Sequence, residues 1–123
     1  MKEKILIAED NPQNMRMIEM TLRPKGYTLL RATDGEEALD VSHRERPDLI
    51  IMDIQLLKMN GLEVTRKLRE NPAFSHIPII GVTAYAMKGD RKKVLEAGCD
   101  AYLSKPINTR ELPEMIDKML SQR

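Results

Sequence analysis

The feature that most constrains the fold of this chain is a regular alternation between short apolar runs and longer segments of helical spacing. Continuous apolar runs, typical of strands that are covered on both faces, occur at 5–8, 49–52 and 79–82. More mixed runs lie at 28–32 and 101–103. The segments between and after the runs carry apolar residues three and four positions apart, as amphipathic helices do. Strands that alternate with helices predict βαβ units and a parallel sheet.

Capping and turn residues lie at the predicted boundaries between strands and helices. Asn11 before Pro12 is typical of a helix N-cap with proline at the first helical position, and Gly26 and Gly98 lie where C-terminal caps are expected. Pro24 should shorten or kink the first helix. We therefore predict an α/β fold with five strands and five helices. It is a doubly wound, flavodoxin-like three-layer sandwich with strand order 2-1-3-4-5.

Length and charge exclude several classes of protein. A chain of 123 residues is one domain's worth, so we expect a single domain over 1–123. Lys and Arg number 20 against 19 Asp and Glu, and this balance excludes a nucleic-acid binder that works by bulk charge. The single cysteine excludes a disulfide framework and suits a reducing compartment. No apolar run is long enough to cross a membrane, so we expect a soluble cytoplasmic protein.

The candidate chemistry lies at the strand ends, because ligands of open parallel sheets bind beyond the carboxyl ends of the strands. Glu9 and Asp10 follow the first strand, Asp53 the third, Thr83 the fourth and Lys105 the fifth. Three neighbouring carboxylates repel one another unless a cation neutralises them, and an all-oxygen ligand set suits Mg²⁺. Lys105 and Thr83 would then hold the oxygens of a phosphoryl group. Asp53, on a central strand, is the natural nucleophile for forming an acyl phosphate.

These motifs together resemble one protein family. Motifs along essentially the whole chain are similar to those of the receiver domains of two-component response regulators: Glu9-Asp10-Asn11, Ile50-Ile51-Met52-Asp53, Gly61, Val82-Thr83-Ala84 and Ser104-Lys105-Pro106. Within this CheY-like family, 52–55 and 83–90 are most similar to single-domain regulators of the DivK type. The resemblance implies a switch that is controlled by phosphorylation.

The resemblance also implies a metal site and a phosphoryl donor. Asp53 would accept a phosphoryl group from the histidine of a kinase or of a histidine phosphotransfer protein. Mg²⁺, with Mn²⁺ as the alternative ion, would be held by Asp10, by Asp53, by the backbone carbonyl of Gln55 and, through water, by Glu9. Gln55 and Tyr85 would occupy positions that tune the hydrolysis of the acyl phosphate.

Further roles concern the phosphoryl group and the switch. Lys105 would contact the phosphoryl oxygens, and its peptide bond to Pro106 would be cis. Thr83 would turn inward to the phosphoryl group and Tyr102 would follow it. The small Ala84 would leave its backbone N–H free for a phosphoryl oxygen.

One position departs from the family pattern. Leu57 stands where these receivers usually have proline, in the loop 53–61. Proline restricts the backbone of its loop, so its absence is expected to loosen this one. The departure puts the rigidity of the loop in doubt and leaves the nucleophile in place.

The output of such a switch would pass through protein contacts. The sequence shows no output domain, so we expect a downstream protein to bind the fourth helix, fifth strand and fifth helix. The basic run 91–93 is either a solvated helix face or a docking patch for an acidic partner. We expect no direct nucleic-acid or membrane partner, and either a monomer or a weak phosphorylation-dependent dimer.

Two other functions are open at this point. A Mg²⁺-dependent phosphohydrolase of the haloacid-dehalogenase kind also uses an aspartate nucleophile, but it needs a second aspartate two residues later, where this chain has Gln55. A pseudo-receiver would have the same fold and never become phosphorylated, which the intact acidic set argues against. We therefore expect a phosphoacceptor rather than an enzyme, with self-phosphorylation and slow self-dephosphorylation as its only chemistry. Nucleotide-binding motifs of the G-x-x-x-x-G-K-[ST] and G-x-G-x-x-G kinds are absent.

Overall fold

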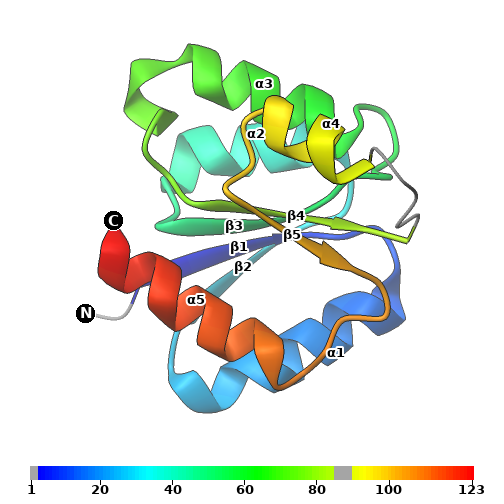
Figure 1. Cartoon of the computed structure of the whole chain (residues 1–123), viewed down its shortest axis with the longest axis vertical. Helices are drawn as coiled ribbons and strands as arrows, with labels where there is room; N and C mark the ends of the chain where they lie inside the picture. Colours follow the sequence, from blue (N-terminus) through cyan, green and yellow to red (C-terminus); the bar gives the residue numbers. More distant parts are fainter. Residues whose placement is uncertain (1–2, 85–89) are drawn as a thin grey trace.

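Five parallel strands form the centre of the fold, in the predicted order β2-β1-β3-β4-β5 (Figure 1). The computed structural model describes residues 3–84 and 90–123. The strands are Lys4–Ala8 (β1), Thr28–Ala32 (β2), Leu49–Asp53 (β3), Ile79–Thr83 (β4) and Ala101–Ser104 (β5). They confirm the five predicted strands and extend four of them by one residue, so that Asp53 and Thr83 are the last residues of β3 and β4 rather than the residues after them.

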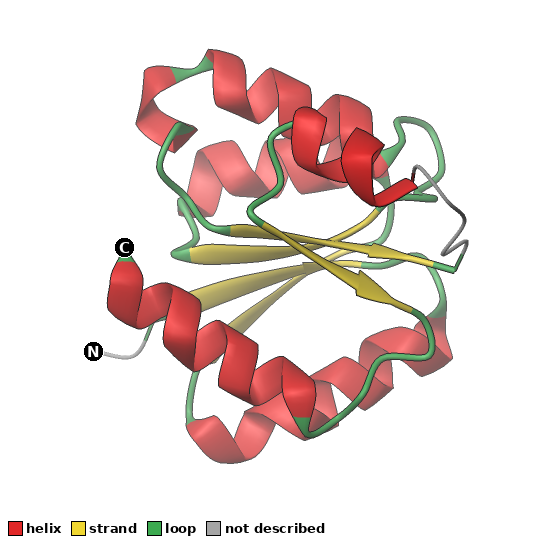
Figure 2. Ribbon diagram, viewed as in Figure 1, coloured by secondary structure: helices red, strands yellow, loops and turns green. Residues whose placement is uncertain are grey.

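Helices cover both faces of the sheet, as Figure 2 shows. One face carries α1 (Pro12–Leu22) and α5 (Glu111–Gln122), and the other carries α2 (Gly35–Glu45), α3 (Gly61–Glu70) and α4 (Asp90–Glu96). Two short 3₁₀ helices, η1 (Arg23–Lys25) and η2 (Pro72–Phe74), follow α1 and α3. In the part of the chain that the structure describes, no helix is both long and apolar enough to cross a lipid bilayer.

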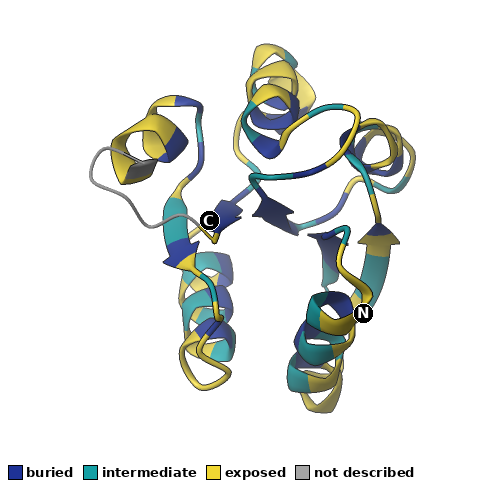
Figure 3. Ribbon diagram, turned by 90° about the vertical axis from the view of Figure 1, so that its right-hand side faces the viewer, coloured by how far each residue is buried: buried dark blue, intermediate teal, exposed yellow. Residues whose placement is uncertain are grey.

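The sheet separates two apolar cores. Alternate residues of a strand point to opposite faces, so Ile5 and Ile7 of β1 pack toward α1 and α5, whereas Leu6 packs toward α2 and α3. Every residue of β3 and β4 is buried, which is why these strands read as continuous apolar runs. Figure 3 shows buried residues along the strands and exposed residues on the outer faces of the helices.

Local signals at the first helix act as the sequence predicts. The Asn11 side chain accepts hydrogen bonds from the backbone N–H groups of Gln13 and Asn14, at 2.9 and 3.0 Å. The α-helix ends at Leu22, and the segment that contains Pro24 continues as η1 up to Gly26, whose φ is 81°. The cap and the helix stop fix where α1 begins and ends. The start of α1 therefore lies directly after the acidic pair that follows β1.

Cys99 gives a testable consequence of this packing. The thiol is buried, with its Sγ 3.8 Å from Thr65 Oγ1, and burial raises its pKa to about 11. The native state thus holds the thiol proton more tightly than the unfolded chain. The resulting stability is fully present below about pH 9 and is lost as the pH rises through about 11.

We therefore expect iodoacetamide at pH 8 to leave Cys99 of the native protein unlabelled, because the thiolate is the reactive form and the thiol is covered. Unfolding in guanidinium chloride should give complete labelling, as measured by intact mass. Equal labelling rates in the native and unfolded protein would contradict the packing described here.

Candidate functional site

Three carboxylates meet at the carboxyl end of the sheet. Glu9 and Asp10 follow β1, Asp53 ends β3, and one ligand atom from each lies within 4.8 Å of the other two. The strands β1 and β3 are neighbours, and their register pairs Ala8 with Met52. The next residue of each strand therefore carries its acid to the same place. Glu9 and Asp53 are both only 2% exposed, whereas Asp10 is half-buried.

Lys105 brings a positive charge into this cluster from the end of β5. Its Nζ lies 3.0 Å from Asp53 Oδ2 and 3.1 Å from Glu9 Oε1. Burial by itself would lower the pKa of Lys105, but the hydrogen bonds and charges of Asp53 and Glu9 outweigh it and raise that pKa. The ammonium group is therefore charged at neutral pH. The peptide bond between Lys105 and Pro106 is cis, as the resemblance implied.

One ammonium group lies among three carboxylates, and the pKa of the buried Glu9 is raised. Burial, followed by the hydrogen bond and charge of Asp53, raises the pKa of Glu9 to about 7, although the Asn11 N–H and Lys105 act in the opposite direction. The Asn11 N–H donates to Glu9 Oε2 at 3.1 Å. The site thus has an excess of negative charge and offers oxygen ligands alone. That combination fits a hard divalent cation such as Mg²⁺.

A side-chain amide links the site to β4. Gln55 Nε2 donates to Thr83 Oγ1 at 2.7 Å, and Gln55 Oε1 accepts from the Ala84 N–H at 3.2 Å. The backbone N–H of Gln55 also donates to Asp53 Oδ1, at 3.0 Å. Thr83 is 2% exposed, and its carbonyl accepts from the Lys105 N–H at 2.8 Å. The sequence drew attention to the Gln55 position, but it gave no signal for this pair of side-chain contacts.

The start of α2 contacts the loop after Asp53 and holds it in place. The Gly35 N–H donates to the Leu57 carbonyl at 3.0 Å, and Lys58 Nζ lies 3.5 Å from Asp34 Oδ2. Lys58 adopts a left-handed backbone with φ of 66°. The side chain of Leu57 is 64% exposed, so it adds little packing to this loop. The loop is therefore anchored by backbone and charge contacts to α2.

Gly61 allows α3 to come close to Asp53. It is the first residue of α3, after Asn60, whose side chain accepts from the Glu63 N–H at 3.0 Å. A Cβ on Gly61 would lie 2.3 Å from the Asp53 carbonyl oxygen. The absence of a side chain at this position lets the helix start directly against the end of β3.

The structure describes Tyr102, a predicted switch residue, but not Tyr85, which was predicted to tune hydrolysis. Tyr102 on β5 is half-buried and packs against the core beneath α2, α3 and α4. Tyr85 lies outside the described residues. The predicted movement of Tyr102 and the tuning role of Tyr85 stay predictions.

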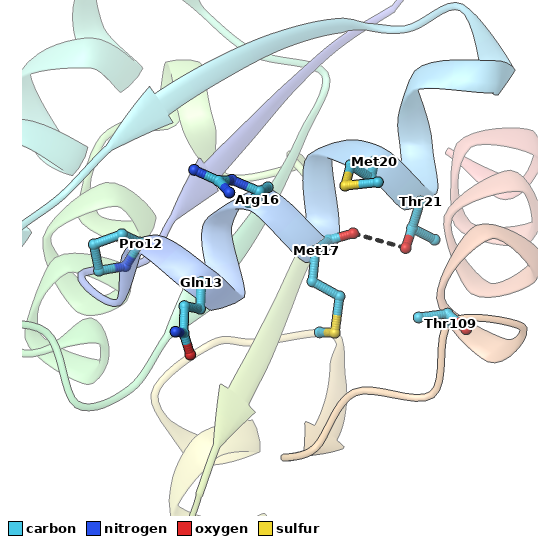
Figure 4. A pocket seen from close by; sticks show the side chains of 7 residues that line it. All are labelled: Pro12, Gln13, Arg16, Met17, Met20, Thr21 and Thr109. Atoms are coloured by element: carbon cyan, nitrogen blue, oxygen red, sulfur yellow. Dashed lines mark hydrogen bonds between the residues drawn. The ribbon is translucent and has the colours of Figure 1, made fainter.

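A groove of about 620 Å³ runs along α1, and the residues of the acidic cluster do not line it (Figure 4). Met20, which is 61% exposed, and Met17 contribute much of its apolar wall, and Arg16 is the charged side chain that lines it. The Thr21 hydroxyl donates to the Met17 carbonyl at 2.8 Å and so stays within the helix. Met15 and Ile18 form the buried face of α1, as apolar residues at helical spacing do, and that spacing gave no indication of the groove.

Comparison with known proteins agrees with this geometry. The family profile described as "Response regulator receiver domain" matches 5–117. The polar-differentiation response regulator DivK of Brucella anthropi is 45% identical over 120 residues, which cover 98% of each chain. The crystal structure of a putative response regulator from Chloroflexus aurantiacus superposes with a TM-score of 0.94 at 31% identity, covering 98% of this chain and 99% of that one.

A second solved structure bears on the acidic cluster. The receiver domain of the sensor histidine kinase PA1611 from Pseudomonas aeruginosa has a TM-score of 0.91 at 37% identity, with 98% of this chain and 99% of that one covered. In that protein a magnesium ion is coordinated in the active-site cleft. The present chain therefore belongs to the response-regulator receiver family and is a receiver of two-component signalling, not a member of a classical enzyme family.

Proposed function

We propose that this chain, as a single receiver over 1–123, accepts a phosphoryl group on Asp53 from the histidine of a kinase or phosphotransfer protein. The bond from phosphorus to the Asp53 oxygen forms as the bond from phosphorus to the donor nitrogen breaks, and the nitrogen keeps the electron pair. The main support is the buried Asp53 carboxylate, which is held at Oδ2 by Lys105 Nζ at 3.0 Å and at Oδ1 by the Gln55 N–H at 3.0 Å. A carboxylate fixed at both oxygens is oriented for attack.

Mg²⁺ is the cofactor that this proposal requires. Asp10 and Asp53 would bind it directly, Glu9 through water, and Gln55 through its backbone carbonyl. When bound, the ion supplies positive charge that offsets the carboxylates and the incoming phosphoryl oxygens. The acidic cluster supports the assignment, because Glu9, Asp10 and Asp53 each place a carboxylate oxygen within 4.8 Å of the others. The magnesium ion of the related PA1611 receiver is further support.

The phosphoryl oxygens would be bound by residues at the ends of β4 and β5. Lys105 would hold one of them with its ammonium group, and the Thr83 hydroxyl and the Ala84 N–H would bind the others. Lys105 and Thr83 are already joined through their backbones at 2.8 Å, so the groups that would contact the phosphoryl oxygens are fixed relative to each other. Tyr102, on the strand that ends beside Lys105, would move with Thr83.

The signal would leave through α4, β5 and α5. β5 is an edge strand of the sheet, and the basic residues 91–93 of α4 are exposed. A downstream protein with an acidic surface is the partner that such a face suits. We propose that the receiver meets its partners in the cytoplasm and that these partners are proteins, not nucleic acids or membranes.

Acetyl phosphate with Mg²⁺, followed by intact mass, tests the function. We expect the wild-type protein to gain one phosphoryl group, and we expect no gain for Asp53→Asn or in the presence of EDTA, because the acceptor or the cation is then missing. Asp40→Asn is the matched control: Asp40 is exposed on α2 and paired with Arg44, so this variant should be phosphorylated like the wild type.

Two results would contradict this assignment. A folded wild-type protein that gains no phosphoryl group with Mg²⁺ would be a pseudo-receiver. Repeated turnover of a phosphomonoester would identify a phosphohydrolase. Gln55 at the second position after the nucleophile carries no acid for a leaving group, and its amide is engaged with Thr83 and Ala84.

A further inference from the structure

We propose that the Gln55 side chain is a latch that occupies the Ala84 N–H before phosphorylation and must release it when the phosphoryl group arrives. The inference rests on the proposed function, which gives that N–H to a phosphoryl oxygen. It assigns to Gln55 a role in the unphosphorylated protein, separate from its backbone carbonyl and from the hydrolysis of the acyl phosphate. Gln55 is in this sense a positioning residue for the end of β4.

The hydrogen bonds fix how the amide is oriented. A backbone N–H can only donate, so the atom that faces the Ala84 N–H at 3.2 Å has to be the Gln55 carbonyl oxygen. The amide nitrogen then faces Thr83 Oγ1, at 2.7 Å, and donates to it. Both ends of the amide are therefore used, and each end has a different partner at the end of β4.

The two contacts have different roles. Thr83 is 2% exposed and ends a fully buried strand, so the amide nitrogen has a buried partner in the unphosphorylated protein. Ala84 is exposed, and its N–H has a single hydrogen to give. A phosphoryl oxygen can bind this N–H only after the Gln55 carbonyl has left it. The competition is therefore for one donor, the Ala84 N–H.

Charge decides this competition in favour of the phosphoryl group. The Gln55 carbonyl is a neutral acceptor, whereas a phosphoryl oxygen is charged, and charge-assisted hydrogen bonds are roughly twice as strong as neutral ones. The latch therefore opens on phosphorylation and closes on hydrolysis. Its backbone places it well for this, because the Gln55 N–H contacts the Asp53 carboxylate itself at 3.0 Å.

The first test needs no phosphoryl group. Amide hydrogen exchange at Ala84, followed by NMR in the metal-free protein, should be slow in the wild type. In Gln55→Ala and in Gln55→Met, which keeps the side-chain length, it should be faster by roughly tenfold, as expected for the loss of one hydrogen bond. Gln122→Ala is the control, because Gln122 is an exposed amide at the end of α5, and exchange at Ala84 should not change. Unchanged exchange in the two Gln55 variants would overturn the latch.

The second test uses beryllofluoride with Mg²⁺ as a mimic of the phosphoryl group. Gln55→Ala and Gln55→Met should bind beryllofluoride about threefold to tenfold more tightly than the wild type, because no competing acceptor has to be displaced from Ala84. A merely structural role of Gln55 would give weaker binding instead. Weaker or equal binding in these variants would therefore overturn the competition.

The wild-type protein separates a failure of the latch from a failure of the proposed function. A wild type that binds no beryllofluoride and gains no phosphoryl group overturns the proposed function, and the latch with it. A wild type that does both, next to Gln55 variants that bind beryllofluoride no better, overturns the latch alone.

Discussion

Replacing Lys105 with methionine is expected to slow the phosphorylation of Asp53 by at least about 100-fold, the usual effect of removing one preorganised group that stabilises charge in a transition state. The Lys105 Nζ lies 3.0 Å from the Asp53 carboxylate, so it is placed to bind an oxygen of the incoming phosphoryl group. No other Lys or Arg side chain of the described residues is paired with Asp53. Methionine fills a similar volume but carries no charge.

The same variant should also be less stable. Without Lys105, the buried Asp53 carboxylate loses its ion-pair partner, and loss of one partner from a buried ion pair costs about 3 kcal/mol or more. The pKa of Glu9, already raised, should rise further, because Lys105 is one of the groups that lowers it. Urea unfolding measures the loss of stability, and added Mg²⁺ should recover part of it.

Lys118→Met is the matched control for both measurements. Lys118 is exposed on α5, so its replacement should leave the phosphorylation rate and the urea midpoint close to those of the wild type. A Lys105→Met protein that reacts with acetyl phosphate within threefold of the wild-type rate would refute the role given to this lysine.

The second large effect is expected at Gly35, far from Asp53 in the sequence. A Cβ at this position would lie 1.7 Å from the Met59 carbonyl oxygen, so Gly35→Ala forces the backbone of the loop after β3 to move. We expect a loss of about 2–3 kcal/mol in the free energy of unfolding, since the clash is with backbone and cannot be relieved by a side-chain rotation. Urea unfolding followed by circular dichroism measures it.

Gly35→Ala should also slow phosphorylation several-fold, because the displaced loop carries Gln55 and joins directly to Asp53. Glu36→Ala is the control, since Glu36 is the next residue of α2 and is exposed. If Gly35→Ala had the same free energy of unfolding as the control, the loop after β3 would be able to move away from the new Cβ with no loss of stability. The contact between α2 and the loop would then have no part in holding the site.

The strands and the strand-end residues could be predicted from the sequence for a clear physical reason. The central strands are covered on both faces, so β3 and β4 must be apolar throughout, and polar residues such as Asp53 and Thr83 are tolerated only where such a strand ends. The end of an apolar run in the sequence therefore predicts a position at the carboxyl edge of the sheet. The prediction was off by one residue at these strand ends, because the last ladder position still pairs with the neighbouring strand.

The contacts that hold the site together could not be predicted in the same way. The pairing of Gln55 with Thr83, the approach of Gly35 to Met59 and the left-handed Lys58 each depend on a loop conformation. Their partners are distant in the chain, and nothing in the local composition sets them. A proline at position 57 would have predicted a rigid loop. The chain has Leu57 there, so nothing in the sequence indicated that contacts with α2 hold the loop.

The residues of the proposed acceptor site come from separate strands, so the site forms only when the whole sheet has formed. Glu9, Asp53, Thr83 and Lys105 come from the ends of β1, β3, β4 and β5, so a chain that has folded only its first half has an aspartate but neither the lysine nor the threonine beside it. Parallel strands pair only after long crossovers have closed, and the site is therefore complete only when the last strand has docked. Under the proposed function, a phosphoryl donor would therefore react only with copies of this protein in which the last strand has docked.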